Sequence, residues 1–377
     1  MAHSAIRFGV LGPLQLRADG ADLPLGPAKQ RAVLATLLIN RNRTVPIDSL
    51  IDAAWQQGPP PEARASLHAH VSRLRRLVGG AGADAGAVLV SAQPGYRLNV
   101  PDEACDFGRF AIERRAGIQA ATAGRFEEAS GHLSAALAEW RGPVLEDLRD
   151  FGFVDAFAAA LTEDKLVTLT ARAEAEIACG RTHSVISELE ALVAEHPYRE
   201  PLWAQLITAY YLAERQYDAL DAYGRLKATL ADDLGIDPGP TLRGLYQRIL
   251  RQEPLDAQNA ARATAKRAAA TLRRPSGGSR ESAVAHLRDA AGGRHPLLAQ
   301  ATRVGRLADN DIVIDDDTVS RYHAVIVDTG NSFVITDLQS ANGVEVAGQR
   351  IRVSATLADG DRICICDHEF TFEIRVG

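Results

Sequence analysis

Residues 304–343 read VGRLADNDIVIDDDTVSRYHAVIVDTGNSFVITDLQSANG, and this stretch decides the fold of the carboxy-terminal part of the chain. It contains short apolar runs separated by turn residues, and the same pattern continues to the end of the chain. Such runs predict strands joined by tight turns. The runs are 312–314, 324–327, 333–337, 344–346, 362–365 and 370–374. Several short strands at this spacing predict an all-β sandwich over residues 295–377.

Polar motifs stand in the loops between these strands. They are Gly305-Arg306, Ser320-Arg321-Tyr322-His323 and Ser340-Ala341-Asn342-Gly343. An arginine beside a hydroxyl donor, both held on a rigid frame, can bind a phosphothreonine dianion through charge-assisted hydrogen bonds. The loops therefore predict a phosphate-binding site.

The order and spacing of these motifs resemble the forkhead-associated (FHA) domain over residues 296–377. The resemblance implies that Ser320 donates its hydroxyl to the phosphate, that Arg306 contacts phosphate and peptide backbone, and that Asn342 hydrogen-bonds the bound peptide. Gln339 stands where such domains often carry Thr or Arg, so the peptide preference is expected to differ. The implied phosphothreonine-binding residues are Arg306, Ser320, Arg321 and Asn342, and the implied structural residues are Gly305, His323 and Gly343.

Residues 1–100 have the pattern of a small DNA-binding domain. Short strands are predicted over residues 6–25, followed by a helix from about Lys29 to Asn42. Helices at Asp48 to Trp55 and Glu62 to Val78 come next, bounded by proline and glycine. Two strand-like pieces, 88–90 and 96–98, then surround a turn at Gln93-Pro94-Gly95. This is the plan of a winged helix of the OmpR type.

The third helix of that plan is predicted to be apolar on one face and basic on the other. Its apolar residues recur at helical spacing and should face the core: Ala63, Leu67, Val71, Leu74 and Val78. A basic helix face suits the major groove, and an arginine near a hairpin tip suits a phosphate. The predicted DNA-binding residues are Arg64, His68, Ser72, Arg75, Arg76 and Arg97. From these residues alone, a solvated helix face is an equal alternative.

Residues 101–253 are predicted to be helix pairs with a weak internal repeat. Arg181 and Arg215 end two similar turns, 34 residues apart. Small and large apolar residues follow at the positions of a tetratricopeptide (TPR)-like unit: Trp203, Leu206, Ala209, Tyr210, Ala219, Leu220 and Tyr223. Residues 254–294 change to Ala, Arg, Gly and Ser, including the run RRPSGG at 273–278, and are predicted to be a linker that is at most partly helical.

The order of these parts resembles the Streptomyces antibiotic regulatory protein (SARP) family. The resemblance includes residues 231–240, which read ADDLGIDPGP, and spans nearly the whole chain. It implies a multidomain α+β protein with an OmpR-type winged helix-turn-helix, an all-α TPR-like bacterial transcriptional activation domain and an all-β FHA sandwich. By resemblance to family members that carry such a sandwich, the protein is expected to act on cell-wall arabinosyltransferase gene promoters. The implied partners are double-stranded promoter DNA, a phosphorylated Ser/Thr protein kinase and RNA polymerase.

The sequence contains no pattern that points to catalysis, a metal or a cofactor. The four cysteines are scattered, and Cys364 and Cys366 are expected to share a core-facing side of a strand. No Walker loop is present, and His68 and His70 point to different faces of one helix. Without a secretory signal or an apolar run of membrane-spanning length, we expect a cytoplasmic protein with no membrane insertion.

Two hypotheses about function follow from these patterns. The first is a DNA-binding transcriptional regulator that is switched by threonine phosphorylation. It is favoured by eleven basic against six acidic residues over 1–100 in a chain of net charge −6. The second is a phospho-dependent adaptor or modulator of a Ser/Thr kinase with weak or no promoter binding. A mobile linker would permit mere tethering of the sandwich, whereas packing of the sandwich against the rest of the chain would permit coupling.

Overall fold

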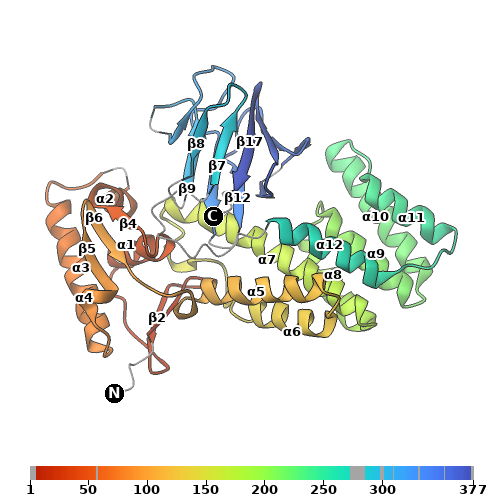
Figure 1. Cartoon of the computed structure of the whole chain (residues 1–377), viewed down its shortest axis with the longest axis horizontal. Coiled ribbons are helices and arrows are strands. Elements are labelled where there is room, and N and C mark those ends of the chain that lie inside the picture. Colours follow the sequence, from red (N-terminus) through yellow and green to blue (C-terminus); the bar gives the residue numbers. More distant parts are fainter. Residues whose placement is uncertain are drawn as a thin grey trace. The chain divides into compact units, whose positions relative to one another are not determined.

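The computed structural model describes residues 6–56, 58–271, 285–297, 301–308, 310–329, 332–351 and 353–374. The chain forms two compact units. Unit 1 comprises Met1–Ile112, Ala138–Lys165 and Ala270–Gly377, and unit 2 comprises Glu113–Leu137 and Leu166–Ala269. Figure 1 shows the amino-terminal strands and helices in red and orange, the helical block in yellow and green, and the carboxy-terminal strands in blue.

The amino-terminal part of unit 1 is the predicted winged helix. A leader sheet with strand order β1-β2-β3 precedes the helices, and a second sheet has the order β4-β6-β5. The terminal hairpin and all three predicted helices are present, whereas strand β4, with three residues, is too short to have been predicted. The elements are β1 Arg7–Gly9, β2 Gln15–Ala18, β3 Ala21–Asp22, α1 Ala28–Ile39, β4 Thr44–Pro46, α2 Ile47–Trp55, α3 Ala63–Gly80, α4 Ala85–Val88, β5 Leu89–Ala92 and β6 Gly95–Leu98.

A buried carboxylate ties the leader sheet to the start of the helical region. Asp106 accepts hydrogen bonds from the backbone N–H groups of Val10 and Leu11 at 2.8 and 2.9 Å. The guanidinium of Arg141 donates to the same carboxylate at 3.1 Å. Burial raises the pKa of Asp106, and the hydrogen bonds and the guanidinium oppose that shift. The three donors thus offset part of the cost of burying the charge.

The helical region repeats one kind of turn between its helices. Gly124, Gly180 and Glu214 each follow a helix with positive φ, at 81°, 78° and 61°. This left-handed conformation ends a helix and favours glycine. The elements are η1 Asp102–Ala104, α5 Asp106–Thr122, α6 Phe126–Leu137, η2 Glu146–Leu148, α7 Phe153–Ala178, α8 Thr182–Glu195, α9 Glu200–Leu212, α10 Gln216–Leu234, α11 Pro240–Leu250 and α12 Ala257–Thr271.

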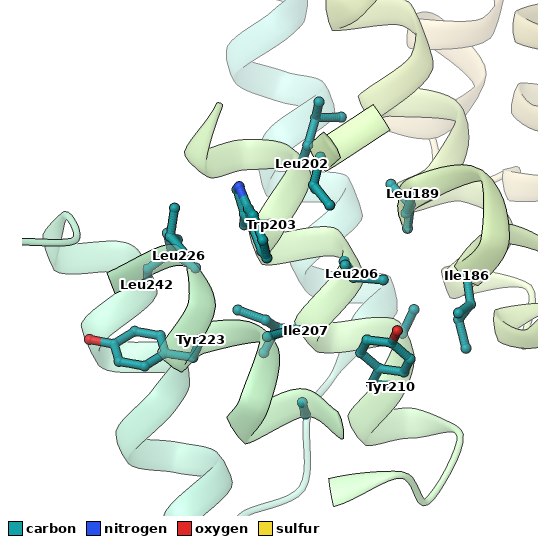
Figure 2. Close-up of a cluster of buried hydrophobic side chains, with 14 of the residues drawn as sticks. Ile186, Leu189, Leu202, Trp203, Leu206, Ile207, Tyr210, Tyr223, Leu226 and Leu242 are labelled. Atoms are coloured by element: carbon teal, nitrogen blue, oxygen red, sulfur yellow. The ribbon is translucent and has the colours of Figure 1, made fainter. Parts of the chain in front are cut away.

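The largest core of unit 2 confirms the predicted TPR-like repeat. Trp203 and Leu206 of α9 lie between Leu189 of α8 and Tyr223 of α10 (Figure 2). The stacked rings of Tyr223 and Tyr246 join α10 to α11, with ring centroids 4.1 Å apart. Neighbouring helices bury apolar faces that no single helix could bury alone.

The prediction of a linker over residues 254–294 was wrong for residues 257–271, which form a packed helix, and for residues 285–289, which form a strand. Residues 257–271 form α12, which packs Ala261 and Ala265 against alanines of α5, α6 and α7 within unit 2. Phe126 of α6 is the large apolar residue of this cluster, and α12 itself contributes only alanines, which mark no apolar face in the sequence although alanine favours helix strongly. The run at 273–278 lies outside the described residues.

Glu174 of α7 gives unit 2 a predicted pH dependence. Burial raises its pKa to about 8, although Gln205 and Thr264 hydrogen-bond to it. A carboxyl whose pKa rises on folding contributes stability that is complete below about pH 4.5 and lost as the pH rises through about 8. We expect the thermal midpoint of the helical unfolding transition to fall over that range. Glu174→Gln should flatten the profile, whereas Glu195→Gln, at an exposed position, should not.

The carboxy-terminal part of unit 1 is the predicted sandwich. One sheet has the order β10-β9-β11-β12-β15 and the other β14-β13-β16-β17-β7-β8. Phe333 and Phe372 meet between the sheets with ring centroids 5.3 Å apart. The strands are β7 Ala285–Asp289, β8 Arg294–Pro296, β9 Ala301–Gly305, β10 Ile312–Val313, β11 Ala324–Asp328, β12 Phe333–Asp337, β13 Val344–Val346, β14 Gln349–Arg350, β15 Ser354–Leu357, β16 Arg362–Ile365 and β17 His368–Ile374.

Two details of the sandwich differ from expectation. The sandwich begins at β7, whose Ala285 and Leu287 are buried, rather than at residue 295. The two apolar residues of β7 were too few to stand out beside the linker composition. On β16, Ile363 and Ile365 face the core, so the expected core position of Cys364 was wrong. Cys366 follows β16 and is partly buried against the same core. Side chains alternate between the two faces of a strand, so Ile363 and Ile365 point inward and Cys364 points to the other face. The larger isoleucines bury more apolar area in the core than cysteine would.

Candidate functional site

The three polar motifs of the sandwich meet at one end of its sheets. The backbone N–H of Arg306, just after β9, donates to the carbonyl of Ser320 at 3.0 Å. The N–H of Ala341 donates to the Ser320 hydroxyl oxygen at 3.1 Å. Residues from three loops that are distant in sequence therefore share one set of hydrogen bonds.

His323 is the buried centre of this arrangement. Its imidazole is fully buried, and Nδ1 accepts from the backbone N–H of Ser320 at 3.1 Å. Its Nε2 lies 3.0 Å from the carbonyl oxygen of Gly343 and donates to it. A neutral imidazole has one donor and one acceptor, and this environment uses both. His323 thus joins the second loop to the third without reaching the surface.

Arg306 and Ser320 both reach solvent. The guanidinium of Arg306 is 38% exposed, with Nε 3.3 Å from the carbonyl of Val319 and Nη1 3.2 Å from the carboxylate of fully exposed Asp317. Because the Ser320 hydroxyl oxygen accepts from Ala341, its proton is available to a ligand. Both groups can therefore approach an anion that enters from solvent.

Asn342 and the loop that contains Thr318 form the neighbouring rim. The Asn342 side-chain amide donates to the carbonyl of Thr318 at 2.8 Å. Asp316 fixes that loop, because it accepts from Thr318 through the backbone and the hydroxyl, and from His368. These bonds lower the pKa of Asp316 to about 2, those from Thr318 most. Arg321 is exposed beside the same loops.

Two glycines and an asparagine shape the loops. A Cβ on Gly305 would lie 2.4 Å from the carbonyl oxygen of Arg321. Gly343 has φ +76°, and a Cβ there would lie 2.5 Å from the guanidinium of Arg350. Sequence reasoning missed Asn310, whose side-chain amide donates to the carbonyls of Leu307 and Arg321 at 2.8 Å. Only its place in an Asp-Asn-Asp turn could have indicated this role.

The winged helix presents a second candidate surface on α3. As predicted, Ala63, Leu67, Val71, Leu74 and Val78 are buried. Arg64, His68, Ser72 and Arg76 are exposed. Arg64 lies 3.4 Å from the carboxylate of Asp48, in an exposed pair. Small residues, Ala65 and Ala69, lie among them, so another molecule could approach the helix backbone closely.

The other two predicted DNA-binding residues have different environments. Arg75 donates from Nε to the carbonyl of Leu89 at 2.9 Å and from Nη2 to the hydroxyl of Ser91 at 3.0 Å. It therefore joins α3 to β5 instead of pointing outward. Arg97 is half-buried on β6, where it is paired with Thr44 of β4.

Sequence reasoning missed Arg73, which is exposed on α3. At about 100° of rotation per residue it lies at the edge of the exposed arc farthest from Arg64. It was passed over because the prediction followed the single stripe through Arg64, His68 and Ser72. Helical spacing alone could have included it once the buried stripe was known.

The parts of the chain that the structure describes contain no group of three or more His, Cys, Asp or Glu side chains placed to hold a metal ion. None of the described helices combines the length and apolar character needed to cross a bilayer.

Three protein-family models match the chain. "Transcriptional regulatory protein, C terminal" matches residues 21–98, "Bacterial transcriptional activator domain" matches residues 105–250, and "FHA domain" matches residues 302–366. These matches confirm the predicted winged helix, the activation domain and the FHA sandwich, in that order.

Relatives match over most of the chain. "Transcriptional regulatory protein EmbR" of Mycobacterium tuberculosis is 64% identical over 371 residues, which cover 98% of this chain and 96% of the relative. "Transcriptional regulatory protein MoaR1" of the same species is 53% identical over 253 residues, which cover 67% of this chain and 81% of the relative. The solved structure "Mycobacterium tuberculosis EmbR in complex with low affinity phosphopeptide" shares 62% identity, with a TM-score of 0.93 over 99% of both chains.

Proposed function

This chain belongs to the EmbR family of transcriptional regulators, and from that premise we propose that it binds promoter DNA through its winged helix and phosphothreonine through its FHA domain. The observation that carries the phosphothreonine assignment is the convergence of Arg306, Ser320 and Asn342 from three loops. A solved EmbR structure in complex with a phosphopeptide supports it.

In the proposed phosphothreonine site each side chain has its own role. Arg306 supplies the charge-assisted donors, Ser320 supplies a hydroxyl donor, and Arg321 adds positive potential at the rim. Asn342 contacts the peptide backbone by exchanging its present bond to Thr318. Gly305, His323 and Gly343 keep the loops in position and do not touch the ligand.

In the proposed DNA interface, the exposed arc of α3 enters the major groove. Arg64, His68, Ser72 and Arg76 approach the duplex, and we add Arg73 to them. Arg75 contributes by positioning the hairpin, and Arg97 lies close enough to the hairpin tip to approach a phosphate once its half-buried side chain extends. Arginines on the arc would contact phosphates or guanine edges.

The partners and setting follow from the family membership. We propose that a phosphorylated Ser/Thr protein kinase is the phosphothreonine partner, that RNA polymerase contacts the activation domain, and that cell-wall arabinosyltransferase promoters are the targets. We further propose a non-enzymic protein of the cytoplasm that needs no cofactor. A chain that binds phosphopeptide but no promoter would instead be a kinase adaptor.

Charge removal on α3 tests the DNA interface. We expect Arg76→Ala and Arg73→Ala each to weaken binding of a promoter fragment and to reduce the slope of log affinity against log salt by about 1, because each arginine releases about one counterion on contacting a phosphate. Mobility shifts over a series of salt concentrations measure both. Arg225→Ala, on an exposed face of the helical block, is the matched control. Unchanged slopes in both α3 variants would contradict the interface.

A further inference from the structure

Two strands of the five-stranded FHA sheet, β11 and β12, are buried on both faces. All five residues of β11 are buried. Ala324 and Ile326 belong to the core between the two sheets. Alternation along the strand turns Val325 and Val327 to the opposite face, yet they are only 3% and 1% exposed. A sandwich surrounded by water would expose that outer face.

Unit 1 itself provides what covers this face. The hydroxyl of Ser332, just before β12, donates to the carboxylate of Asp164 on α7 at 2.6 Å, and both residues are fully buried. Ser354 of β15 and Glu163 lie 3.4 Å apart farther along the sheet, where Ser354 is paired with Thr336 of β12. Polar groups buried with matched partners indicate a specific contact, because a loose contact would leave them in water.

A buried ion pair extends the contact to the winged helix. Arg43, between α1 and β4, donates to the carboxylate of Asp328 at the end of β11 at 2.9 Å. The side chains are 16% and 3% exposed. Arg43 and Asp328 are 285 positions apart and belong to the same compact unit. The FHA domain is thus docked, and its connection to the winged helix does not depend on a tether.

The Arg43–Asp328 pair joins the end of β11 opposite Ser320 and His323 to the end of β4 opposite the hairpin tip. In the FHA domain, the loop from Ser320 to His323 immediately precedes β11, whereas Asp328 ends it, so a whole strand of about 3.3 Å per residue separates that loop from Asp328. In the winged helix, the hairpin tip at Pro94 lies beside Pro46 at one end of β4, and Arg43 precedes the other end.

We propose that this docking lets one molecule hold promoter DNA and a phosphothreonine protein at the same time, with both surfaces open, so that the chain acts as a rigid bridge between the two. This inference rests on the proposed function, because it requires each ligand to bind separately. The ion pair uses none of Arg306, Ser320 and Asn342, so a phosphothreonine protein can reach its loops while the domains stay docked.

The test uses the full chain, a labelled phosphothreonine peptide and a promoter fragment. Binding of each ligand alone is measured first, and failure there contradicts the proposed function and not the bridge. The peptide is then titrated into chain saturated with DNA. We expect its dissociation constant to stay within about twofold of the value without DNA, with a ternary complex visible as a further mobility shift. A loss of tenfold or more in the presence of DNA would overturn the bridge.

Variants of the ion pair test the docking itself. Asp328→Asn, and independently Arg43→Gln, should leave both separate affinities within about twofold while enlarging the radius of gyration measured by X-ray scattering. Asp367→Asn, at an exposed position in the same sandwich, is the matched control and should change neither. If both ion-pair variants keep the wild-type radius, Arg43 and Asp328 do not hold the domains together and the assignment fails.

Discussion

Arg306→Ala is expected to lower the affinity for a phosphothreonine peptide by at least about 100-fold. A charge-assisted hydrogen bond contributes about 1.5–3 kcal/mol, and the guanidinium can make two of them to one phosphate. Every 1.4 kcal/mol, approximately, is tenfold in affinity. The partly exposed position of Arg306 means that its removal leaves the buried links among the loops in place. Titration of a labelled peptide, followed by anisotropy or calorimetry, measures the effect.

The peptide affinities of further variants distinguish loss of phosphate recognition from general destabilisation of the domain. Arg306→Lys should restore part of the affinity, because it returns the charge without the planar fork. Ser320→Ala should cost less than Arg306→Ala, since it removes one neutral donor. Arg294→Ala, at an exposed position on β8, should change nothing. An Arg306→Ala chain that binds the peptide as tightly as the wild type would remove the proposed pocket.

Trp203→Ala is expected to destabilise the helical block by about 3–5 kcal/mol. Trp203 is 5% exposed and lies among apolar residues of α8, α9 and α10 (Figure 2). Its indole N–H donates to the carbonyl of Pro197 at 2.8 Å, so truncation also leaves that carbonyl without its partner. A lower thermal midpoint, or a lower midpoint concentration of urea, followed by helical circular dichroism, measures the loss.

Two variants show whether burial is the cause. Trp203→Phe keeps most of the apolar volume and should cost much less than the alanine variant. Tyr217→Ala removes another aromatic ring of the same block, but that ring is 79% exposed and should contribute little. Equal losses at Tyr217 and Trp203 would show that the packed repeat is not what stabilises this region.

Periodic patterns were enough to predict the elements that bury a face. The core stripe of α3, including Leu67, Val71 and Leu74, follows directly from helical spacing, and the predicted residues are all buried. The repeat around Trp203 was visible for the same reason. The packing of α12 was not predicted, because the buried residues of this helix are alanines, which mark no apolar face.

Some residues of the candidate site could also be predicted from the sequence, and others could not. The loop motifs of the sandwich occur in the order of the FHA domain, so the roles of Arg306, Ser320 and Asn342 were predicted from that resemblance. The role of Asn310 was not, because its bonds go to backbone carbonyls that only the folded loops bring near. Arg75 differs from the exposed arginines of α3 because its side chain donates to the carbonyl of Leu89. No local sequence pattern specifies that contact.

The contacts of Arg75 with β5, together with the 2.6 Å contact between His68 and the hydroxyl of Tyr96, hold α3 and the terminal hairpin as one body. Because α3 and the terminal hairpin cannot move relative to each other, they favour DNA whose groove widths already match the distance between them. Twisting or compressing an ill-fitting duplex costs elastic energy that depends on base steps no side chain touches. We therefore expect operators with identical contacted bases but different intervening steps to differ in occupancy.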